Sequence, residues 1–274
     1  EMMLEPGKAP LTEAAVRKIY ADLHAYANET AHFAPEVRRV LETLSERFPQ
    51  LLAEIVWDDA RFISDSPGKN RGHAGLGGGG ESTRILVEAL ARAEREIVIQ
   101  SPYLVIPDEG LDLFERLIMR GVSISIVTNS LPATDNLQAF SGYAKQRRKL
   151  LALGVELREF KPAPAVEREL IERYAALEKT APVFAIHAKS FVVDEQVLYV
   201  GTFNLDPRSV NLNTEVGILV DNPTLARQVR AQIAIDMLPA NSWNPRVYDA
   251  DLDAAFDKRL EVFFWKLLPL TAVL

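Results

Sequence analysis

Beyond residue 80 the sequence alternates between helical and extended hydrophobic patterns, and this alternation limits the possible folds more than any other feature. Helical patterns occupy Ile85–Ala93, the segment around Leu113–Ile118, which Gly121 ends, and Leu137–Leu153, which Gly154 ends. Strand patterns occupy Glu96–Gln100, Val122–Asn129 and Val155–Phe160. Strands and helices in alternation imply parallel pairing, with helices on the faces of the sheet.

The remaining predicted strands follow a charged, proline-containing interval, Lys161 to Pro182, which we expect to lie outside the sheet. Two apolar strands, about Phe184–Val193 and Val197–Phe203, flank a predicted hairpin turn at Asp194-Glu195-Gln196. A further strand spans Thr214–Val220, and a helix is expected from Asn222-Pro223 onward, with a buried stripe of Leu225, Val229 and Ile233. The predicted fold class is α/β, with a mixed, largely parallel sheet flanked by helices on both faces.

The first 80 residues form a predicted helical preface and linker. Two helical faces, divided by Pro35, consist of Val16, Tyr20 and Leu23 and of Val37, Leu41 and Leu44. The segment Ser64–Thr83 is rich in glycine, but no Lys-Ser or Lys-Thr pair follows the glycines and no dinucleotide fingerprint fits. We therefore interpret it as a mobile linker, with residues 81–274 as the α/β part.

The composition limits the possible partners. With 31 Lys and Arg against 38 Asp and Glu, the formal net charge is −7, which gives no general affinity for nucleic acid or for an anionic membrane surface, so phosphate recognition must be local. The absence of cysteine excludes disulfides and thiol catalysis. No signal peptide is visible, and since the chain begins with Glu1 and not Met, we expect it to be a fragment.

No run in the sequence reaches the ~18 apolar residues needed to span a bilayer. The nearest is the tail Val262–Leu274, which Lys266 and Pro269 interrupt. It fits a C-terminal segment packed on the core, and alternatively a membrane-facing patch.

Four polar side chains are concentrated in the predicted hairpin. His187 and Lys189 share one face of a strand because side chains alternate, and Thr202 and Asn204 do so on the next. If the two strands pair, an imidazole, an ammonium, a hydroxyl and an amide converge near one end of the sheet. Such a set suits a tetrahedral oxyanion, since the last three supply charge and oriented donors and the imidazole attacks or transfers a proton.

The segment His187–Asn204 has the form His-x-Lys, four residues, Asp, six residues, Gly-Thr-x-Asn. This spacing resembles the HKD signature of the phospholipase D superfamily. The segments Ser101–Asn136 and Gly201–Pro223 extend the resemblance to the C-terminal half of bacterial cardiolipin synthases and related phosphatidyltransferases. It covers roughly residues 81–274, which would be a phospholipase D-like catalytic half with one HKD signature.

The resemblance implies a role for each residue of the signature. One histidine of a pair attacks phosphorus to give a phosphohistidine, and the other protonates the leaving alcohol and later activates the acceptor. The nucleophile usually comes from the first signature, which would make His187 the general acid/base. Lys189 and Asn204 would bind phosphoryl oxygens with help from Thr202, and Glu215 would fix the tautomer of the histidine. No metal or other cofactor is implied.

Several of these residues also have a purely structural interpretation. Thr202 fits a strand by propensity alone, and Glu215 could be a strand-end carboxylate. Asp194 lies at the turn, and alternation directs its side chain to the face opposite that of His187 and Lys189. We therefore expect a structural role for Asp194, as for Gly201 of the signature.

Two residues outside the signature are also candidates for binding substrate. Arg208, beside Ser209, could shape the mouth of the site or form a salt bridge. Tyr103, with Pro107, follows the C-terminal end of a strand, where α/β sheets place ligands, although Tyr103 could only pack.

One signature is not enough for the implied mechanism, because in-line displacement needs histidines on opposite sides of phosphorus. His24, His32 and His73 are not followed two residues later by lysine. The second HKD half would come from an N-terminal half absent from this chain or from a homodimer mate. We favour the absent half because the chain resembles a C-terminal half, and we expect the isolated chain to be poorly active.

The function expected from the resemblance is phosphatidyl transfer of the cardiolipin synthase type at the bacterial inner membrane, as a peripheral protein. The substrates would be a phospholipid and an alcohol or phosphatidylglycerol acceptor. One alternative is a nuclease or other phosphodiesterase, which the low net basicity disfavours. Another is a non-catalytic half that only binds anionic lipid or completes an assembly, which the intact signature disfavours. The sequence leaves open the acceptor, the head group, the membrane face and the oligomeric state.

Overall fold

The computed structural model describes residues 12–29, 35–53, 55–69, 79–166 and 183–268. Its helices are α1 Glu13–Asn28, α2 Pro35–Ala53, α3 Glu81–Ala91, α4 Asp108–Met119, α5 Leu137–Leu153, α7 Pro207–Asn211, α8 Pro223–Asp236 and α9 Phe256–Leu267, with a 3-10 turn, η3, at Ala250–Asp253. Its strands are β1 Ala60–Ser64, β2 Glu96–Gln100, β3 Ser123–Asn129, β4 Glu156–Phe160, β5 Ser190–Val193, β6 Val197–Gly201, β7 Val216–Asp221 and β8 Ser242–Trp243.

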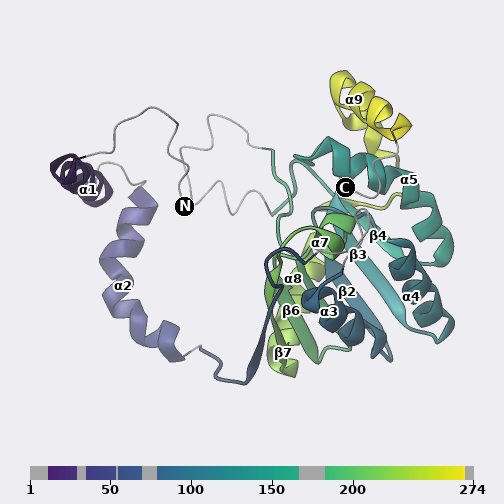
Figure 1. Cartoon of the computed structure of the whole chain (residues 1–274), viewed down its shortest axis with the longest axis horizontal. Helices are drawn as coiled ribbons and strands as arrows, with labels where there is room; N and C mark the ends of the chain where they lie inside the picture. Colours follow the sequence, from purple (N-terminus) through teal and green to yellow (C-terminus); the bar gives the residue numbers. More distant parts are fainter. Residues whose placement is uncertain (1–11, 30–34, 54, 70–78, 167–182, 269–274) are drawn as a thin grey trace. The chain divides into compact units, whose positions relative to one another are not determined.

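The chain divides into two compact units. One contains α1 and α2, which form where the sequence predicts them, with Thr12 capping α1 through a hydrogen bond from the Ala15 N–H. Their apolar side chains are largely exposed, Tyr20 and Leu23 among them. The other unit contains every strand described (Figure 1).

The strands of the second unit form one mixed sheet in the order β1-β7-β6-β5-β2-β3-β4-β8. This confirms the α/β class, but the expected predominance of parallel pairing is wrong. Among the described strands, only β2–β3 and β3–β4 pair in parallel. The alternating pattern predicted those three strands correctly, whereas β5 enters beside β2 in the antiparallel sense. The hairpin turn keeps β6 antiparallel to β5, and β7, which follows α7, is also antiparallel to β6.

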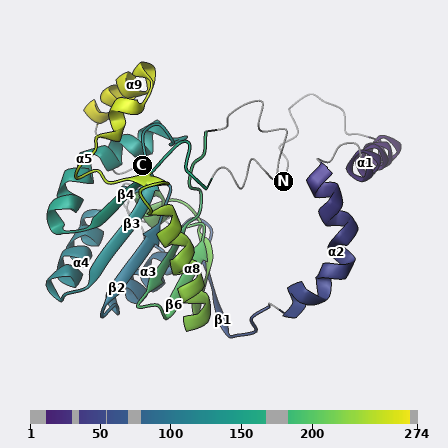
Figure 2. The same cartoon turned by 180° about the vertical axis from the view of Figure 1, so that it is seen from behind.

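Helices cover both faces of the sheet, as predicted. Alternation along β2 sends Ile97 and Ile99 into the core under α3, α4 and α5, and Val98 into the smaller core under α8. The α3 and α4 side faces the viewer in Figure 1 and the α8 side in Figure 2. The predicted helix boundaries agree closely for α5, which Gly154 ends with φ of 101°, and for α8, whose first N–H groups bond to the side chain of Asn222.

The segment Ser64–Thr83 differs from the expected linker. Strand β1 ends at the first residue of this segment, Ser64, and pairs with β7, so the sheet includes residues that the sequence placed in the preface. At the far end of the segment, Ser82 is buried at the start of α3. The described parts of this segment, residues 64–69 and 79–83, belong to the α/β unit, and residues 70–78 lie outside the described residues.

The strand predicted from Phe184 is shorter in the structure, because β5 begins only at Ser190. Ser190 pairs with Gln100, the last residue of β2, and the chain of β2 then continues into Ser101 and Pro102. Proline has no N–H for a ladder, so the residues before Ser190 run past the end of their neighbouring strand. This places His187 and Lys189 beyond the edge of the regular sheet. Of the interval Lys161–Pro182, residues 161–166 carry no strand and the rest lies outside the described residues.

Candidate active site

The hairpin that carries the signature is anchored at its turn. Asp194 and Glu195 have positive φ angles of 53° and 57°, as the central residues of a type I′ turn require. The Asp194 carboxylate accepts hydrogen bonds of 2.8 Å from the N–H groups of Glu94, Arg95 and Glu96. Burial acts to raise the pKa of Asp194, but these backbone donors outweigh it and the pKa lies below its usual value. This geometry supports the structural role proposed for Asp194, which fastens the hairpin to the start of β2.

His187 and Lys189 lie just before β5, against the ring of Tyr103. The His187 side chain is exposed, and its ring centroid lies 6.4 Å from that of Tyr103 in an edge-on contact. The Lys189 ammonium lies 5.9 Å from the Tyr103 ring centroid and donates a 3.0 Å hydrogen bond to the carbonyl oxygen of His187. Tyr103 therefore supports both residues.

Lys189 is half-buried and has carboxylates nearby. Burial lowers its pKa, and the negative charges of Glu215, Asp206 and Asp135 oppose that shift. Within the described residues its ammonium forms no ion pair. A half-buried ammonium without an ion-pair partner is prepared to bind an anion.

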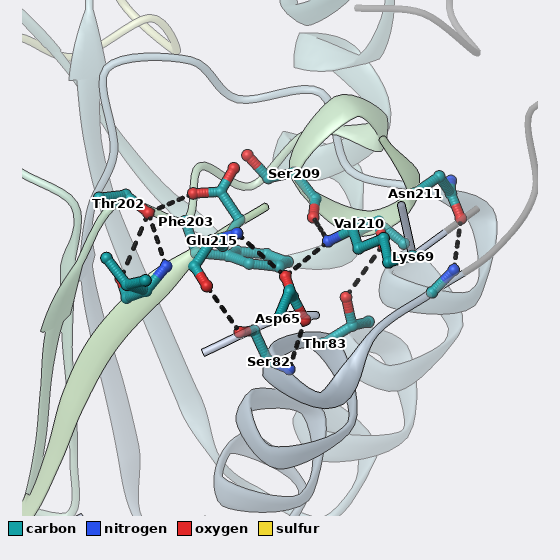
Figure 3. Close-up of polar contacts among 12 residues, drawn as sticks. Asp65, Lys69, Ser82, Thr83, Thr202, Phe203, Ser209, Val210, Asn211 and Glu215 are labelled. Carbon is teal, nitrogen blue, oxygen red and sulfur yellow. Dashed lines mark hydrogen bonds and ion pairs between the residues drawn. The ribbon is translucent and has the colours of Figure 1, made fainter. Parts of the chain in front are cut away.

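The side chains of Thr202, just after β6, and Glu215, just before β7, contact each other (Figure 3). The Thr202 hydroxyl donates to the Glu215 carboxylate and accepts a 3.0 Å hydrogen bond from the Val216 N–H. The resemblance implied that Glu215 bonds to His187. In the described residues, however, the Glu215 carboxylate bonds to Thr202 and not to the His187 ring.

Gly201 is required by close packing at the end of β6. A Cβ atom there would lie 2.2 Å from the Tyr199 hydroxyl and 2.5 Å from the carbonyl oxygen of Val216. Gly201 also donates a 3.1 Å hydrogen bond to the carbonyl oxygen of Lys189, so the two ends of the signature are joined. These contacts support the structural role that we expected for Gly201.

Asn204 is buried at the entry to the short helix α7. Its N–H donates to the Ser209 hydroxyl at 3.1 Å, and the Asp206 carboxylate caps the helix by accepting from the Ser209 N–H at 2.7 Å. The Asn204 side-chain oxygen is buried and has no partner among the described residues. An unpaired buried oxygen costs about 1–3 kcal/mol, which favours a site completed by another group. Burial raises the pKa of Asp206.

The two candidates outside the signature differ in their surroundings. The Tyr103 hydroxyl donates to Asp135, with both carboxylate oxygens at 3.1 Å, and burial, together with Asp135, raises the pKa of Tyr103 to about 12. Ser101 donates to the Tyr103 carbonyl and accepts from the Leu205 N–H, which ties this loop to the signature. Arg208 is exposed on α7, and no salt bridge of its side chain is found among the described residues.

Sequence reasoning missed a buried ion pair beneath the site, formed by Asp65 and Lys69 (Figure 3). Asp65 accepts hydrogen bonds from Lys69 at 2.8 Å, from the Ser82 N–H at 2.9 Å and from the Glu215 N–H at 3.1 Å. Lys69 also donates to the Ser209 carbonyl at 2.6 Å. The pair therefore holds the backbone of both Glu215 and Ser209. The sequence signal for this pair was an acidic residue followed four positions later by a lysine. This spacing is also common on exposed surfaces, so it did not indicate a buried ion pair.

The described residues offer no group of three or more His, Asp or Glu side chains arranged to hold a metal ion. No helix among them is both long and apolar enough to cross a bilayer.

Comparisons with known proteins agree with the resemblance to the phospholipase D superfamily. Residues 86–237 match the family described as "Cardiolipin synthase, PLD-like domain". The chain is 33% identical over 211 residues to cardiolipin synthase C of Escherichia coli K12, and the matched segment covers 76% of this chain and 40% of that protein. It is 28% identical over 191 residues to cardiolipin synthase A of Buchnera aphidicola subsp. Schizaphis graminum, covering 68% of this chain and 33% of the relative. The chain thus spans less than half the length of these relatives.

Among solved structures, phosphatidylserine synthase of Haemophilus influenzae Rd KW20 matches with a TM-score of 0.52 and 15% identity, over 79% of this chain and 47% of that one. At this identity the likeness concerns the fold alone. The family match and the identity to cardiolipin synthase C show that the chain belongs to the phospholipase D superfamily, where it resembles the cardiolipin synthases.

Proposed function

We propose that this chain supplies one half-site of a phosphatidyltransferase of the cardiolipin synthase type, which acts through a phosphohistidine. The donor is a phospholipid, and the acceptor is an alcohol such as glycerol or the head group of phosphatidylglycerol. The observation that carries the proposal is the half-buried Lys189 ammonium, which lies next to exposed His187 and has no ion-pair partner in the described part of the chain. A phosphodiester anion is the partner that this pair fits.

In the first step, a histidine from the other half-site attacks phosphorus, and the bond between phosphorus and the leaving alcohol oxygen breaks. His187 gives its proton to that oxygen, so the alcohol leaves neutral and the phosphatidyl group stays on the nucleophile. In the second step, His187 takes the proton from the acceptor hydroxyl, whose oxygen attacks phosphorus and releases the histidine. Lys189 and the Asn204 amide bind the non-bridging oxygens as their negative charge grows.

The source of the second histidine is part of the proposal. The curated relatives are more than twice as long as the segment that this chain matches, so we favour a second HKD half elsewhere in the same protein. A second copy of the chain is the alternative. We further propose a peripheral location at the bacterial inner membrane, where the substrates are.

The test compares His187→Ala and Lys189→Ala with His24→Ala, a change at an exposed histidine on α1. In the full-length protein, either site variant should lower phosphatidyl transfer by about a thousandfold, because His187→Ala removes a general acid/base and Lys189→Ala removes a group that stabilises the growing negative charge. The His24 variant should keep wild-type turnover.

Each variant is also assayed for hydrolysis of single- and double-stranded DNA. Near-normal phospholipid turnover by the His187 variant would refute the assignment. Hydrolysis of DNA without phospholipid turnover would show that the protein is a nuclease.

A further inference from the structure

Helix α9 has an uninterrupted apolar face directed to solvent. Its exposed large side chains recur at i, i+4, i+7, i+8 and i+11, which places them on one side of the helix. They are 43–70% exposed: Phe256 70%, Leu260 43%, Phe263 56%, Phe264 57% and Leu267 66%. The helix lies at one end of the α/β unit, beside α5 (yellow in Figure 1).

The opposite face of α9, which packs on the domain, includes two lysines. Lys258 donates hydrogen bonds of 3.1 Å to the carbonyl oxygens of Pro132 and Thr134. Lys266 is half-buried, and burial lowers its pKa. Only Val262 on this helix is fully buried. A helix that packs on its own core normally turns its apolar stripe inward and its charges outward. On α9 the apolar stripe faces outward and the two lysines lie toward the domain, so the stripe is available to a partner outside the domain.

The position of α9 links this stripe to the candidate active site. Lys258 holds the loop at Thr134, and the next residue, Asp135, accepts the hydrogen bond of Tyr103. The Tyr103 ring in turn contacts His187 and Lys189. The helix is therefore attached to a loop that borders the site.

The charges around α9 are mixed, with an exposed basic group on its neighbour. Lys145 on α5 donates to the Leu268 carbonyl at the end of α9, and Arg148 and Lys149, also exposed, follow on the same helix. On α9 itself, Asp257 and Glu261 are exposed acids. The exposed cations of α5 lie beside the aromatic stripe, and this local arrangement fits a surface that carries anionic head groups.

We propose that α9 lies in the plane of a phospholipid bilayer, with its stripe of Phe256, Leu260, Phe263, Phe264 and Leu267 in the boundary between head groups and acyl chains. The cations of α5 then meet anionic head groups, and the active site faces the surface that holds its substrate. The choice of a bilayer over a second copy of the chain rests on the proposed function, since both would cover an apolar stripe.

The test is co-sedimentation of the full-length protein with vesicles of phosphatidylethanolamine and phosphatidylglycerol. The variant Phe263→Ser/Phe264→Ser should bind at least tenfold more weakly than wild type. The matched control is Met119→Ser/Val247→Ser, in which two other exposed apolar residues, 76% and 83% exposed, change elsewhere on the same unit. It should bind as wild type does, and circular dichroism should show that both variants are folded.

Turnover of a short-chain, monomeric phospholipid separates this inference from the proposed function. The α9 variant should keep that turnover and lose only turnover on vesicles. Wild-type vesicle binding by the α9 variant would overturn the inference. If the α9 variant also changed from dimer to monomer while its vesicle binding stayed the same, the stripe would be assigned to a second copy of the chain. If wild type binds vesicles through α9 but transfers nothing from any phospholipid, the proposed function fails and the docking surface stands.

Discussion

Removal of Asp65 should destabilise the α/β unit severely, because the ion pair beneath the candidate site is almost sealed from water. The side chains of Lys69 and Asp65 are 3% and 0% exposed. In Asp65→Ala the Lys69 ammonium keeps its burial and loses its counter-charge, a change that costs about 3–5 kcal/mol. The N–H groups of Ser82 and Glu215 also lose their acceptor, so the upper part of this range is expected.

Urea unfolding followed by tryptophan fluorescence measures this cost as a lower midpoint at an unchanged slope. The control is Glu88→Ala, which breaks an exposed ion pair with Arg84 and should leave the midpoint close to wild type. The double variant Asp65→Leu/Lys69→Met should recover much of the loss, since it buries no unpaired charge. A cost below about 1 kcal/mol for Asp65→Ala would refute the argument that the pair is desolvated.

The same pair predicts a dependence of stability on pH. Burial acts to raise the pKa of Asp65, but Lys69 and the backbone donors lower it below the usual value of an aspartate. A carboxyl group whose folded pKa is depressed contributes its full stability above the unfolded pKa and loses it as the pH falls through the folded pKa. The difference in unfolding free energy between wild type and Asp65→Ala should therefore be constant near neutral pH and shrink below about pH 4.

Two further changes test the supports of the signature. Gly201→Ala should lower the melting temperature and reduce turnover, because its Cβ would lie 2.2 Å from the Tyr199 hydroxyl. The double variant Tyr199→Phe/Gly201→Ala should recover part of the loss. A Gly201→Ala protein as stable as wild type would show that this contact is not tight. Asp194→Ala should lower the free energy of unfolding by about 1–3 kcal/mol, since three backbone N–H groups lose the carboxylate that accepts their hydrogen bonds. Asp194→Asn should lower this free energy by less. Equal losses for the two variants in urea unfolding would contradict the assignment to hydrogen bonding.

Local sequence was sufficient for the central helices and strands of this fold. Helix α5 ends at Gly154 because a left-handed C-cap is a local requirement, and the turn at Asp194 follows from two flanking apolar runs. The candidate site residues could likewise be named in advance, because the signature places His187, Lys189, Thr202 and Asn204 at fixed intervals on one hairpin.

The contacts among those residues were less predictable. The sequence pointed to Glu215, but it did not show that Glu215 bonds to Thr202 or that Asp65 holds its backbone from 150 positions away. Strand β1 was also missed, since it is exposed along most of its length and so lacks the buried pattern of the central strands.

The sequence by itself determined the alternating elements, the hairpin and the signature that marks this superfamily, because each depends on residues close together in the chain. Only the tertiary structure decided that β5 enters antiparallel beside β2, that Asp65 and Lys69 lie beneath the site, and that α9 turns its apolar face outward. Hydrophobic periodicity shows that a segment has an apolar face, but which partner covers that face depends on contacts between residues far apart in the chain.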